Sequence, residues 1–574
     1  MLDFKTCHDK QTGEWYIETS ISGKQLLTTP QLNKGTAFTR EERREFGLLG
    51  KLPNRVETLD EQIKRAYLQF SSYSSRMQQH IYLNNLHDKN QILFYKLLSQ
   101  HLGEMLPVIY TPIVGTAVKS FSREYRQPRG LYIAHSDENL IDEILENRSN
   151  PEIDLIVVTD GEGVLGIGDQ GVGGMDIPVA KLMVYSLCGG IDPTRVLPIF
   201  LDVGTNNQEL LNDPMYLGTR HPRISGSRYD TFVKKFVNSV IKHFPNAFLH
   251  WEDLGRGNAR RILDQFQDEL CTFNDDIQGT GAVTLSALLA GCDITGVTLE
   301  NQRIVVFGAG SAGTGISEQI VDSMVRCGLT REEAHQRFWL IDRQGLLLKD
   351  DPDLTTPQEP FARTLEDVSD WDIRDKKQIS LTDTVRHVQP TVLIGCSAQP
   401  GAFSQSIIEI MCEHIERPII FPLSNPDDRC EAQPENILAW SNGKALIATG
   451  TAFPAIEYEN RLVQIAQCNN ALVFPGIGLG ILAVRASRLS KSMIWAAAQA
   501  LNELSPSKKD SFLPLLPSLD KAQVVAKHIA VAVARTAIES GLAQINQDKD
   551  IEALIHEMFW EPRYLPFKRV KNST

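Results

Sequence analysis

The segment IVVFGAGSAGTGISEQIVDSM, residues 304–324, decides the fold of this 574-residue chain, because glycines in it join a strand pattern to a helix pattern. Its β-branched start predicts a strand, and the part after the glycines repeats apolar residues at helical spacing. Gly308, Gly310 and Gly313 have the GxGxxG spacing that lets backbone N–H groups and a helix N-terminus hold a pyrophosphate. A tight strand-to-helix turn without a ligand is the alternative interpretation.

An acidic residue at the end of the next strand supports the dinucleotide interpretation, because it can accept hydrogen bonds from ribose hydroxyls. RFWLIDRQG supplies Asp342, later than the usual spacing of roughly 20 residues because a helical segment, LTREEAHQRF, is inserted. A second GxGxxG spacing, at Gly161, Gly163 and Gly166, lacks the strand and helix context and predicts a glycine-rich loop. The region around Gly308 therefore predicts a Rossmann-like unit that binds a dinucleotide.

Strand and helix patterns alternate on both sides of this unit. Before it come the strands IDLIVVTD, VLPIFLDVGTNN and AFLHWEDLG, and after its first strand come RFWLIDRQG, TVLIGCS, PIIFPLSNP and ALIATG. This order predicts parallel sheets with helices packed on them. Residues 40–102 and the chain after Asn470 follow helical spacing. We predict a multidomain α/β fold: a Rossmann-like NAD-binding domain, a second parallel α/β domain, and helical N- and C-terminal regions.

The length of the chain predicts more than one domain, with boundaries that need not be continuous in sequence. The predicted boundaries are an N-terminal helical domain at 1–128, a substrate-binding and catalytic α/β domain at 129–274 with 470–535, the Rossmann-like domain at 275–469, and a helical tail at 536–574.

Composition and charge limit the class of protein. A hydrophobic content of 42% with 22% charged residues is typical of a globular protein, and no apolar run approaches the roughly 20 residues of a membrane span. The net charge of −13 argues against nucleic acid or an anionic membrane as the main partner. Nine cysteines without metal-ligand spacing favour a reducing compartment, and the N-terminus resembles neither a signal nor a transit peptide. We therefore predict a cytoplasmic protein.

Two pairs of adjacent acids follow predicted strands. CTFNDDIQGTG, residues 271–281, holds Asp275 and Asp276, and HWEDLGRGNA holds Glu252 and Asp253. Carboxylates that share a crevice suit a hard divalent cation, Mg²⁺ or Mn²⁺, and the lack of a His or Cys cluster disfavours zinc. A pair of capped turns is the alternative, because Asp and Asn are common at N-caps and in turns. The residues alone leave both interpretations open.

Lys181 and Tyr110 are candidates for proton transfer. Lys181 is a single cation inside the apolar run IPVAKLMVYSLCGG, and Tyr110 lies in LPVIYTPIVG. If the lysine is buried near a divalent cation, its pKa falls and the neutral amine can accept a proton, whereas a tyrosine can donate one. The alternatives are a lysine that extends to the surface and a tyrosine that fills the core.

Taken together, these segments resemble the malic enzyme family over nearly the whole chain. The motifs that carry the resemblance are VIYTPIVG, VVTDGEGVLGIGDQGVGGM, LDVGTNN, WEDLGRGNA, CTFNDDIQGTGAV, FGAGSAGTGI, LSNP and QCNNALVFPGIGLG. The resemblance implies oxidative decarboxylation of L-malate to pyruvate, with NAD and either Mn²⁺ or Mg²⁺ as cofactors. Members of the family are usually tetramers built as dimers of dimers, so a homotetramer is expected.

The resemblance also implies a role for each residue that matches a family motif. It implies that Tyr110 is the general acid, that Lys181 is the general base and that Asp275 is a substrate and proton-network residue. The metal ligands that it implies are Glu252, Asp253 and Asp276. It further implies that Asn425 and Asn470 bind the malate and nicotinamide ends, and that NAD is contacted by Gly308, Gly310, Gly313 and Asp342.

One departure from the family pattern leaves a second activity open. Animal members continue the glycine-rich motif as GER, with an arginine that contacts malate, where this chain has Gly163. Bacterial members and malolactic enzymes share the form seen here, and malolactic enzymes convert malate to lactate without releasing NADH. The segments GGMDIPVAKL and NPDDR favour the malic enzyme. A non-catalytic NAD-binding sensor would require the loss of an acid or of Lys181, and none is missing.

The choice of dinucleotide follows from two positions. NADP-dependent animal members place a lysine where this chain has Gln358. A 2′-phosphate is also repelled by Asp342, which Arg343 offsets only in part. We therefore predict a preference for NAD.

Overall fold

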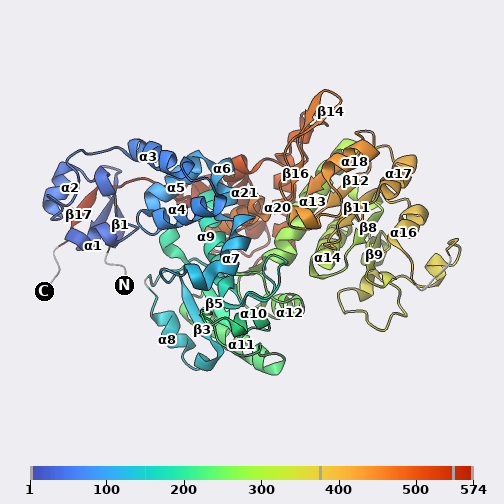
Figure 1. Cartoon of the computed structure of the whole chain (residues 1–574), viewed down its shortest axis with the longest axis horizontal. Coiled ribbons are helices and arrows are strands. Elements are labelled where there is room, and N and C mark those ends of the chain that lie inside the picture. The colour runs from blue at the N-terminus through green and yellow to red at the C-terminus, as the bar shows by residue number, and fades with distance from the viewer. Residues whose placement is uncertain (1–3, 149, 374–377, 546–549, 571–574) are drawn as a thin grey trace. The chain divides into compact units, whose positions relative to one another are not determined.

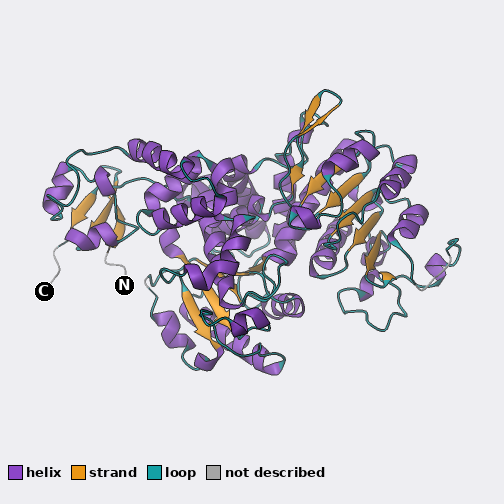
Figure 2. Cartoon of the chain, in the orientation of Figure 1, coloured by secondary structure: helices purple, strands orange, loops and turns teal. Residues whose placement is uncertain are grey.

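The computed structural model describes residues 4–148, 150–373, 378–545 and 550–570 (Figure 1). The chain forms two compact units, one made of residues 1–247 with 557–574 and the other of residues 248–556. Helices and mostly parallel strands make up both (Figure 2), which confirms the predicted α/β class with helical terminal regions. The domain boundaries predicted from the sequence remain predictions.

The first unit begins with a small sheet followed by helices. β1 (Phe4–His8) pairs antiparallel with β2 (Trp15–Thr19), and β2 pairs parallel with β17 (Phe567–Arg569) from the other end of the chain. The sequence pattern does not predict this sheet, because its strands are short and largely exposed. The helices after it agree with the prediction and are α1 (Gly23–Thr28), α2 (Arg40–Glu45), α3 (Leu59–Ser71), α4 (Arg76–His87), α5 (Gln91–Gln100), α6 (Leu102–Ile109) and α7 (Ile113–Glu124).

Parallel strands follow in the same unit. β4 (Leu155–Thr159) pairs with β5 (Val196–Asp202), and β5 pairs with β3 (Leu131–Ala134). Every residue of β4 is buried, which is why its sequence is a continuous apolar run rather than an alternating one. The glycines after β4 form a loop and a short 3₁₀ turn, as predicted. The helices of this part are α8 (Ile141–Glu146), α9 (Asp176–Gly189), α10 (Gln208–Asn212) and α11 (Ser227–His243).

The second unit contains a seven-stranded sheet in the order β10-β9-β8-β11-β12-β13-β16, parallel except between β9 and β10. In this sheet β9 lies on one side of β8 and β11 lies on the other, so the strand order reverses at β8. Doubly wound sheets bind ligands at such a point, outside the carboxyl ends of the strands. The strands are β8 (Ile304–Phe307), β9 (Phe338–Asp342), β10 (Gly345–Leu346), β11 (Val392–Gly395), β12 (Ile419–Pro422), β13 (Leu446–Thr449) and β16 (Ala466–Gln467).

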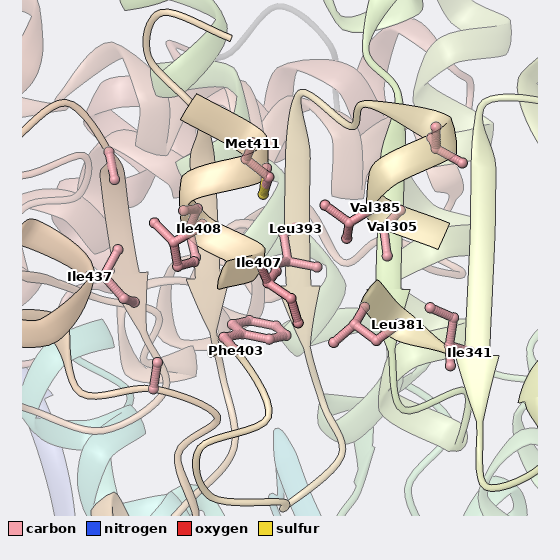
Figure 3. Packing of buried hydrophobic residues seen from close by; sticks show 14 of the residues in the cluster. Val305, Ile341, Leu381, Val385, Leu393, Phe403, Ile407, Ile408, Met411 and Ile437 are labelled. Carbon is pink, nitrogen blue, oxygen red and sulfur yellow. The ribbon is translucent and has the colours of Figure 1, made fainter. Parts of the chain in front are cut away.

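Apolar side chains fix one face of this sheet to its helices (Figure 3). Val305 of β8 and Leu393 of β11 belong to one buried cluster with side chains of α16 (Leu381–Val388) and α17 (Gln405–His414). Full burial of one such side chain stabilises the fold by roughly 1.5–3 kcal/mol. The loops at the carboxyl ends of β8 and β11 are therefore carried by a firmly packed layer.

The two acidic segments follow a pair of parallel strands. β6 (Phe248–Trp251) pairs parallel with β7 (Thr272–Asn274), and a π-helical turn, Asp275–Gly279, leads from β7 into α13 (Thr280–Thr295). Among the described residues, this turn with α13 is the one helix long and apolar enough to cross a membrane, but most of it is buried, as in the core helix of a soluble protein.

The remaining helices and strands complete the described part of the chain. They are α12 (Arg256–Phe266), α14 (Ser311–Arg326), α15 (Arg331–His335), α18 (Pro434–Trp440), β14 (Ile456–Tyr458), β15 (Arg461–Val463), α19 (Phe474–Val484), α20 (Lys491–Glu503), α21 (Ala522–Glu539) and α22 (Ile551–Met558).

Candidate active site

The glycine turn after β8 has the geometry that dinucleotide binding requires. Gly310 is the N-cap of α14, so the first N–H groups of this helix face the carboxyl edge of the sheet. Gly308 has φ of +104°, and a Cβ there would lie 2.5 Å from the carbonyl group of Cys396. A Cβ at Gly313 would lie 2.0 Å from the carbonyl oxygen of Gly308. Close packing therefore excludes larger residues from both positions, as expected for a turn that approaches a pyrophosphate.

Asp342 is the last residue of β9 and is held beside the glycine turn by Gln358. Nε2 of the buried Gln358 donates to Asp342 Oδ2 at 3.1 Å and to the carbonyl oxygen of Ala309 at 2.9 Å. Gln358 thus ties the acid to the turn where a ribose would lie. The sequence marked Gln358 only as a sign of cofactor preference, and the structure adds this supporting contact.

The two predicted asparagines belong to different parts of the second unit. Asn425 follows β12, and a Cβ at Gly450 would lie 2.9 Å from its Oδ1, so Asn425 packs beside the end of β13. Asn470 lies with the acidic segment, where its Nδ2 donates to Asp275 Oδ2 at 2.9 Å and to Thr280 Oγ1 at 3.0 Å.

Glu252, Asp253 and Asp276 come together, as predicted for metal ligands. Each offers a carboxylate oxygen, and these atoms all lie within 4.8 Å of one another. The N–H of Asp253 also donates to Asp276 Oδ2 at 3.0 Å. Asp253 has φ of +50°, a conformation uncommon outside glycine and found at functional sites. Clustered carboxylates favour a bound cation, and an all-oxygen set fits Mg²⁺ or Mn²⁺.

The acidic segment after β7 forms both a capped helix start and part of the acid cluster, two interpretations that the residues alone left open as alternatives. Asn274 caps the helix, because its side chain accepts a hydrogen bond from the N–H of Ile277 at 3.0 Å. The adjacent acids then face different partners: Asp275 accepts from Asn470, and Asp276 accepts from the backbone of Asp253.

His250 extends the acid cluster in a way that the sequence interpretation missed. The fully buried imidazole has its Nε2 2.7 Å from Glu252 Oε2. His250, Glu252 and Asp275 form a second group of ligand atoms within 4.8 Å of one another, and it shares Glu252 with the first. The available signal was the period of two along a strand, which places residues 250 and 252 on one face. A histidine bonded to a ligand carboxylate fixes the orientation of that carboxylate.

We expect His250→Leu to weaken Mn²⁺ binding by about tenfold to a hundredfold, because such supporting contacts to metal ligands contribute affinity of this size. His250→Gln keeps an N–H donor and is expected to retain most of the affinity. The measurement is Mn²⁺ titration followed by the electron paramagnetic resonance of the free ion. His528→Leu is the control, since His528 pairs with Glu503 on the surface. Wild-type affinity in His250→Leu would refute the orienting role.

The two candidates for proton transfer lie together in the first unit. Nζ of Lys181 lies 5.3 Å from the centroid of the Tyr110 ring. Lys181 is 1% exposed within α9, and Tyr110, which ends α6, is 5% exposed. The alternative of a lysine that extends to the surface is therefore wrong. Burial disfavours the charged ammonium, which is the condition under which a lysine serves as a base.

The glycine-rich loop after β4 is fixed by a buried ion pair that the sequence did not predict. Nε and Nη2 of Arg223 donate to the two carboxylate oxygens of Asp169 at 2.8 Å, and Nη2 donates to the carbonyl oxygen of Asp160 at 2.9 Å. Burial tends to raise the pKa of Asp169, but Arg223 outweighs it and holds the pKa below the ordinary value. Both ends of the segment that carries Gly163 are thereby held.

Comparison with known proteins agrees with this geometry. Residues 87–267 match the model of the malic enzyme N-terminal domain, and residues 277–538 match that of the malic enzyme NAD binding domain. The chain is 48% identical over 548 residues to the NAD-dependent malic enzymes of Vibrio parahaemolyticus and of Aeromonas hydrophila, and each match covers 96% of this chain and 97% of the relative.

Solved structures show the same fold at lower identity. A malic enzyme from Entamoeba histolytica matches with a TM-score of 0.56 at 22% identity, over 90% of this chain and 91% of that one. A malic enzyme from Pyrococcus horikoshii matches with a TM-score of 0.52 at 22% identity, over 79% of this chain and 88% of that one. With two domain models and close relatives that span nearly its whole length, the chain belongs to the malic enzyme family.

Proposed function

We propose that this chain is an NAD-dependent malic enzyme, which converts L-malate to pyruvate and CO₂ while NAD is reduced to NADH. The observation that carries the proposal is the convergence of Glu252, Asp253 and Asp276, beside Asp275 and Asn470, in a chain with a dinucleotide-binding glycine turn. The NAD-dependent malic enzymes that are 48% identical to this chain support the same reaction.

The acid cluster binds the divalent cation in this proposal. Glu252, Asp253 and Asp276 would hold Mn²⁺ or Mg²⁺, which supplies Lewis-acid stabilisation of the negative charge that develops on the substrate. Asn470 keeps the Asp275 carboxylate in place through its 2.9 Å hydrogen bond. Asp275 then serves as a substrate and proton-network residue, and Asn470 lies beside it at the malate end of the site.

Lys181 and Tyr110 divide the proton transfers. Lys181, in its neutral form, takes the proton of the C2 hydroxyl, and Tyr110 donates its phenolic proton to C3 after CO₂ has left C4. Both side chains are buried, with the amine 5.3 Å from the centroid of the ring, so the two groups are close together and shielded from bulk solvent.

The second unit supplies the dinucleotide site. The N-terminus of α14 and the glycines at 308, 310 and 313 would hold the pyrophosphate, and Asp342 would accept hydrogen bonds from the adenosine ribose. NAD supplies the hydride acceptor when bound. Asn425, in the loop after β12, would serve both the nicotinamide end and the malate.

Gln358→Lys is expected to raise the ratio of catalytic efficiency with NADP to that with NAD by about tenfold. A cation at this position pairs with a 2′-phosphate, a gain of roughly 1.5–3 kcal/mol in a charged hydrogen bond, which the nearby Asp342 partly cancels. Initial rates with each dinucleotide measure the ratio. A wild-type enzyme that used NADP as well as NAD would contradict the predicted preference.

The experiment that tests the proposed function follows NADH, pyruvate and lactate together after L-malate, NAD and Mn²⁺ are added to the purified protein. Equimolar pyruvate and NADH support the malic enzyme reaction. Lactate without NADH would establish the malolactic reaction instead. Binding of NAD without turnover of malate would establish a sensor.

The same proposal covers assembly and location. The net charge of −13 supports a protein without nucleic acid or membrane as a partner, and nine free thiols support a reducing compartment such as the cytoplasm. The small-molecule partner is L-malate, and the proposed assembly is a homotetramer, as is usual in the family. Light scattering coupled to gel filtration measures the assembly, and a monomeric mass would overturn that part of the proposal.

A further inference from the structure

We propose that Glu431 is a positioning residue for the dinucleotide site, which holds the loops after β11 and β12 against the glycine turn. This inference rests on the proposed function, because it concerns how the same site is kept in shape. Glu431 is fully buried, yet it is neither a predicted ligand nor part of a motif that binds NAD.

The carboxylate of Glu431 joins two loops that are far apart in sequence. Its Oε1 accepts hydrogen bonds from the N–H and the hydroxyl of Ser397, at 2.7 and 2.9 Å. Oε1 also accepts from the hydroxyl of Ser424 at 2.5 Å, and Oε2 accepts from the N–H of Ser424 at 3.4 Å. A buried carboxylate is retained only where donors surround it, so this set of contacts indicates a built structural node.

The two serines stand at the carboxyl ends of neighbouring strands. Ser397 follows β11 and Ser424 follows β12, and the N–H of Ala398 donates to the Ser424 hydroxyl at 2.8 Å. Gly395, which ends β11, is needed there, because a Cβ would lie 2.5 Å from the carboxyl carbon of Glu431. The loops are therefore bonded both to Glu431 and to each other.

These loops border the parts of the site that contact NAD in the proposed function. A Cβ at Gly308 would lie 2.7 Å from the backbone nitrogen of Ser397, so the glycine turn packs directly on the first loop. Asn425 comes directly after Ser424 in the second loop. The strand order reverses at β8, which lies between β9 and β11, and doubly wound sheets bind their ligand at such a point.

From this geometry, loss of the carboxylate frees both loops at once. The position of Asn425 and the wall of the glycine turn would become less defined, and NAD would bind more weakly. The acid cluster at Glu252, Asp253 and Asp276 follows β6 and β7 and does not belong to the loops that Glu431 holds, so binding of a cation alone should not respond.

The test compares Glu431→Ala, Glu431→Gln and Glu435→Gln, the last an exposed acid nearby on α18 and the matched control. In each purified full-length variant, the Kd for NAD is measured by calorimetry without malate, and the Kd for Mn²⁺ by electron paramagnetic resonance. We expect Glu431→Ala to raise the Kd for NAD by about thirtyfold or more, because several charge-assisted hydrogen bonds are lost. Glu431→Gln keeps one oxygen acceptor and should raise it by only about threefold to tenfold.

The expected result includes an unchanged Kd for Mn²⁺ in all variants and wild-type values in Glu435→Gln. An unchanged Kd for NAD in Glu431→Ala would overturn the inference, and so would an equal loss of NAD and Mn²⁺ binding, which indicates general damage to the fold. If Glu431→Ala does not fold, Glu431→Gln decides by the same criteria. Failure of the proposed function is distinguishable, because it would appear in the wild-type protein as lack of NAD binding or of malate turnover.

Discussion

Asp276→Asn is expected to lower kcat/KM for malate with Mn²⁺ by about a thousandfold or more, because the cation contributes several kcal/mol to the transition state and this variant removes a charged ligand. Asn has nearly the same volume and can still accept from the N–H of Asp253, so the turn after β7 should keep its shape. The loss therefore reports on the cation site and not on the packing around it.

Two measurements separate this explanation from unfolding. Mn²⁺ affinity should fall in Asp276→Asn while the thermal unfolding temperature without metal stays close to that of the wild type. Asp264→Asn is the control, since Asp264 pairs with Arg260 on the exposed side of α12. Retained turnover and retained Mn²⁺ affinity in Asp276→Asn would remove it from the set of ligands.

The second large effect is expected from Lys181→Ala, which should lower kcat by about 10²-fold to 10⁴-fold, the usual contribution of a general base. Lys181 is 1% exposed beside Tyr110, so no neighbouring water takes its place readily. Truncation to Ala leaves a space that a small amine can occupy. Added ammonium should therefore restore part of the rate, and the restored rate should rise with pH as the free amine forms.

Rescue by an amine distinguishes proton transfer from a merely structural role, which ammonium would not restore. The Kd values for NAD and for Mn²⁺ should stay near those of the wild type, since neither site contains this lysine. Lys235→Ala, which removes a surface lysine paired with Glu138, is the control and should keep full activity. A Lys181→Ala variant with a normal kcat would exclude the lysine as the base.

The fold was predictable where the signals were local. The strand, glycines and helix at 304–324 fall in one continuous segment, and the buried strands of both sheets are short apolar runs, so each could be identified without knowledge of its partners. The sheet made by β1, β2 and β17 was not predictable, because its strands are short and join the two ends of the chain.

The site was predictable only in part. Residues after strands pointed to four acids, Glu252, Asp253, Asp275 and Asp276. The choice of three of them as metal ligands, and the roles given to Tyr110 and Lys181, came from the resemblance to a family. His250 was not identified from the sequence, because an imidazole inside an apolar strand gives no sign of the carboxylate that it contacts.

The role of Glu431 could not be predicted from the sequence, for a different reason. One of its partners, Ser397, is 34 residues away in sequence, and serine and glutamate are common in loops. Contacts of this kind depend on which loops the sheet topology brings together, and no spacing along the chain encodes them.

The helix α13 shows how much depends on the turn before it. Nearly all residues of α13 from Gly281 to Cys292 are buried, so each face of the helix must meet its own neighbours: a Cβ at Gly291 would lie 2.7 Å from Ile419, and one at Gly281 would lie 3.0 Å from Gln319. The Asn274 cap and the π turn at Asp275–Gly279 must therefore deliver the helix with the rotation about its axis that this packing requires. Because one residue advances a helix by about 100°, a single insertion or deletion in this turn would rotate every side chain of α13. The length of the acidic turn is thus constrained independently of its charge, by the helix that it sets in phase.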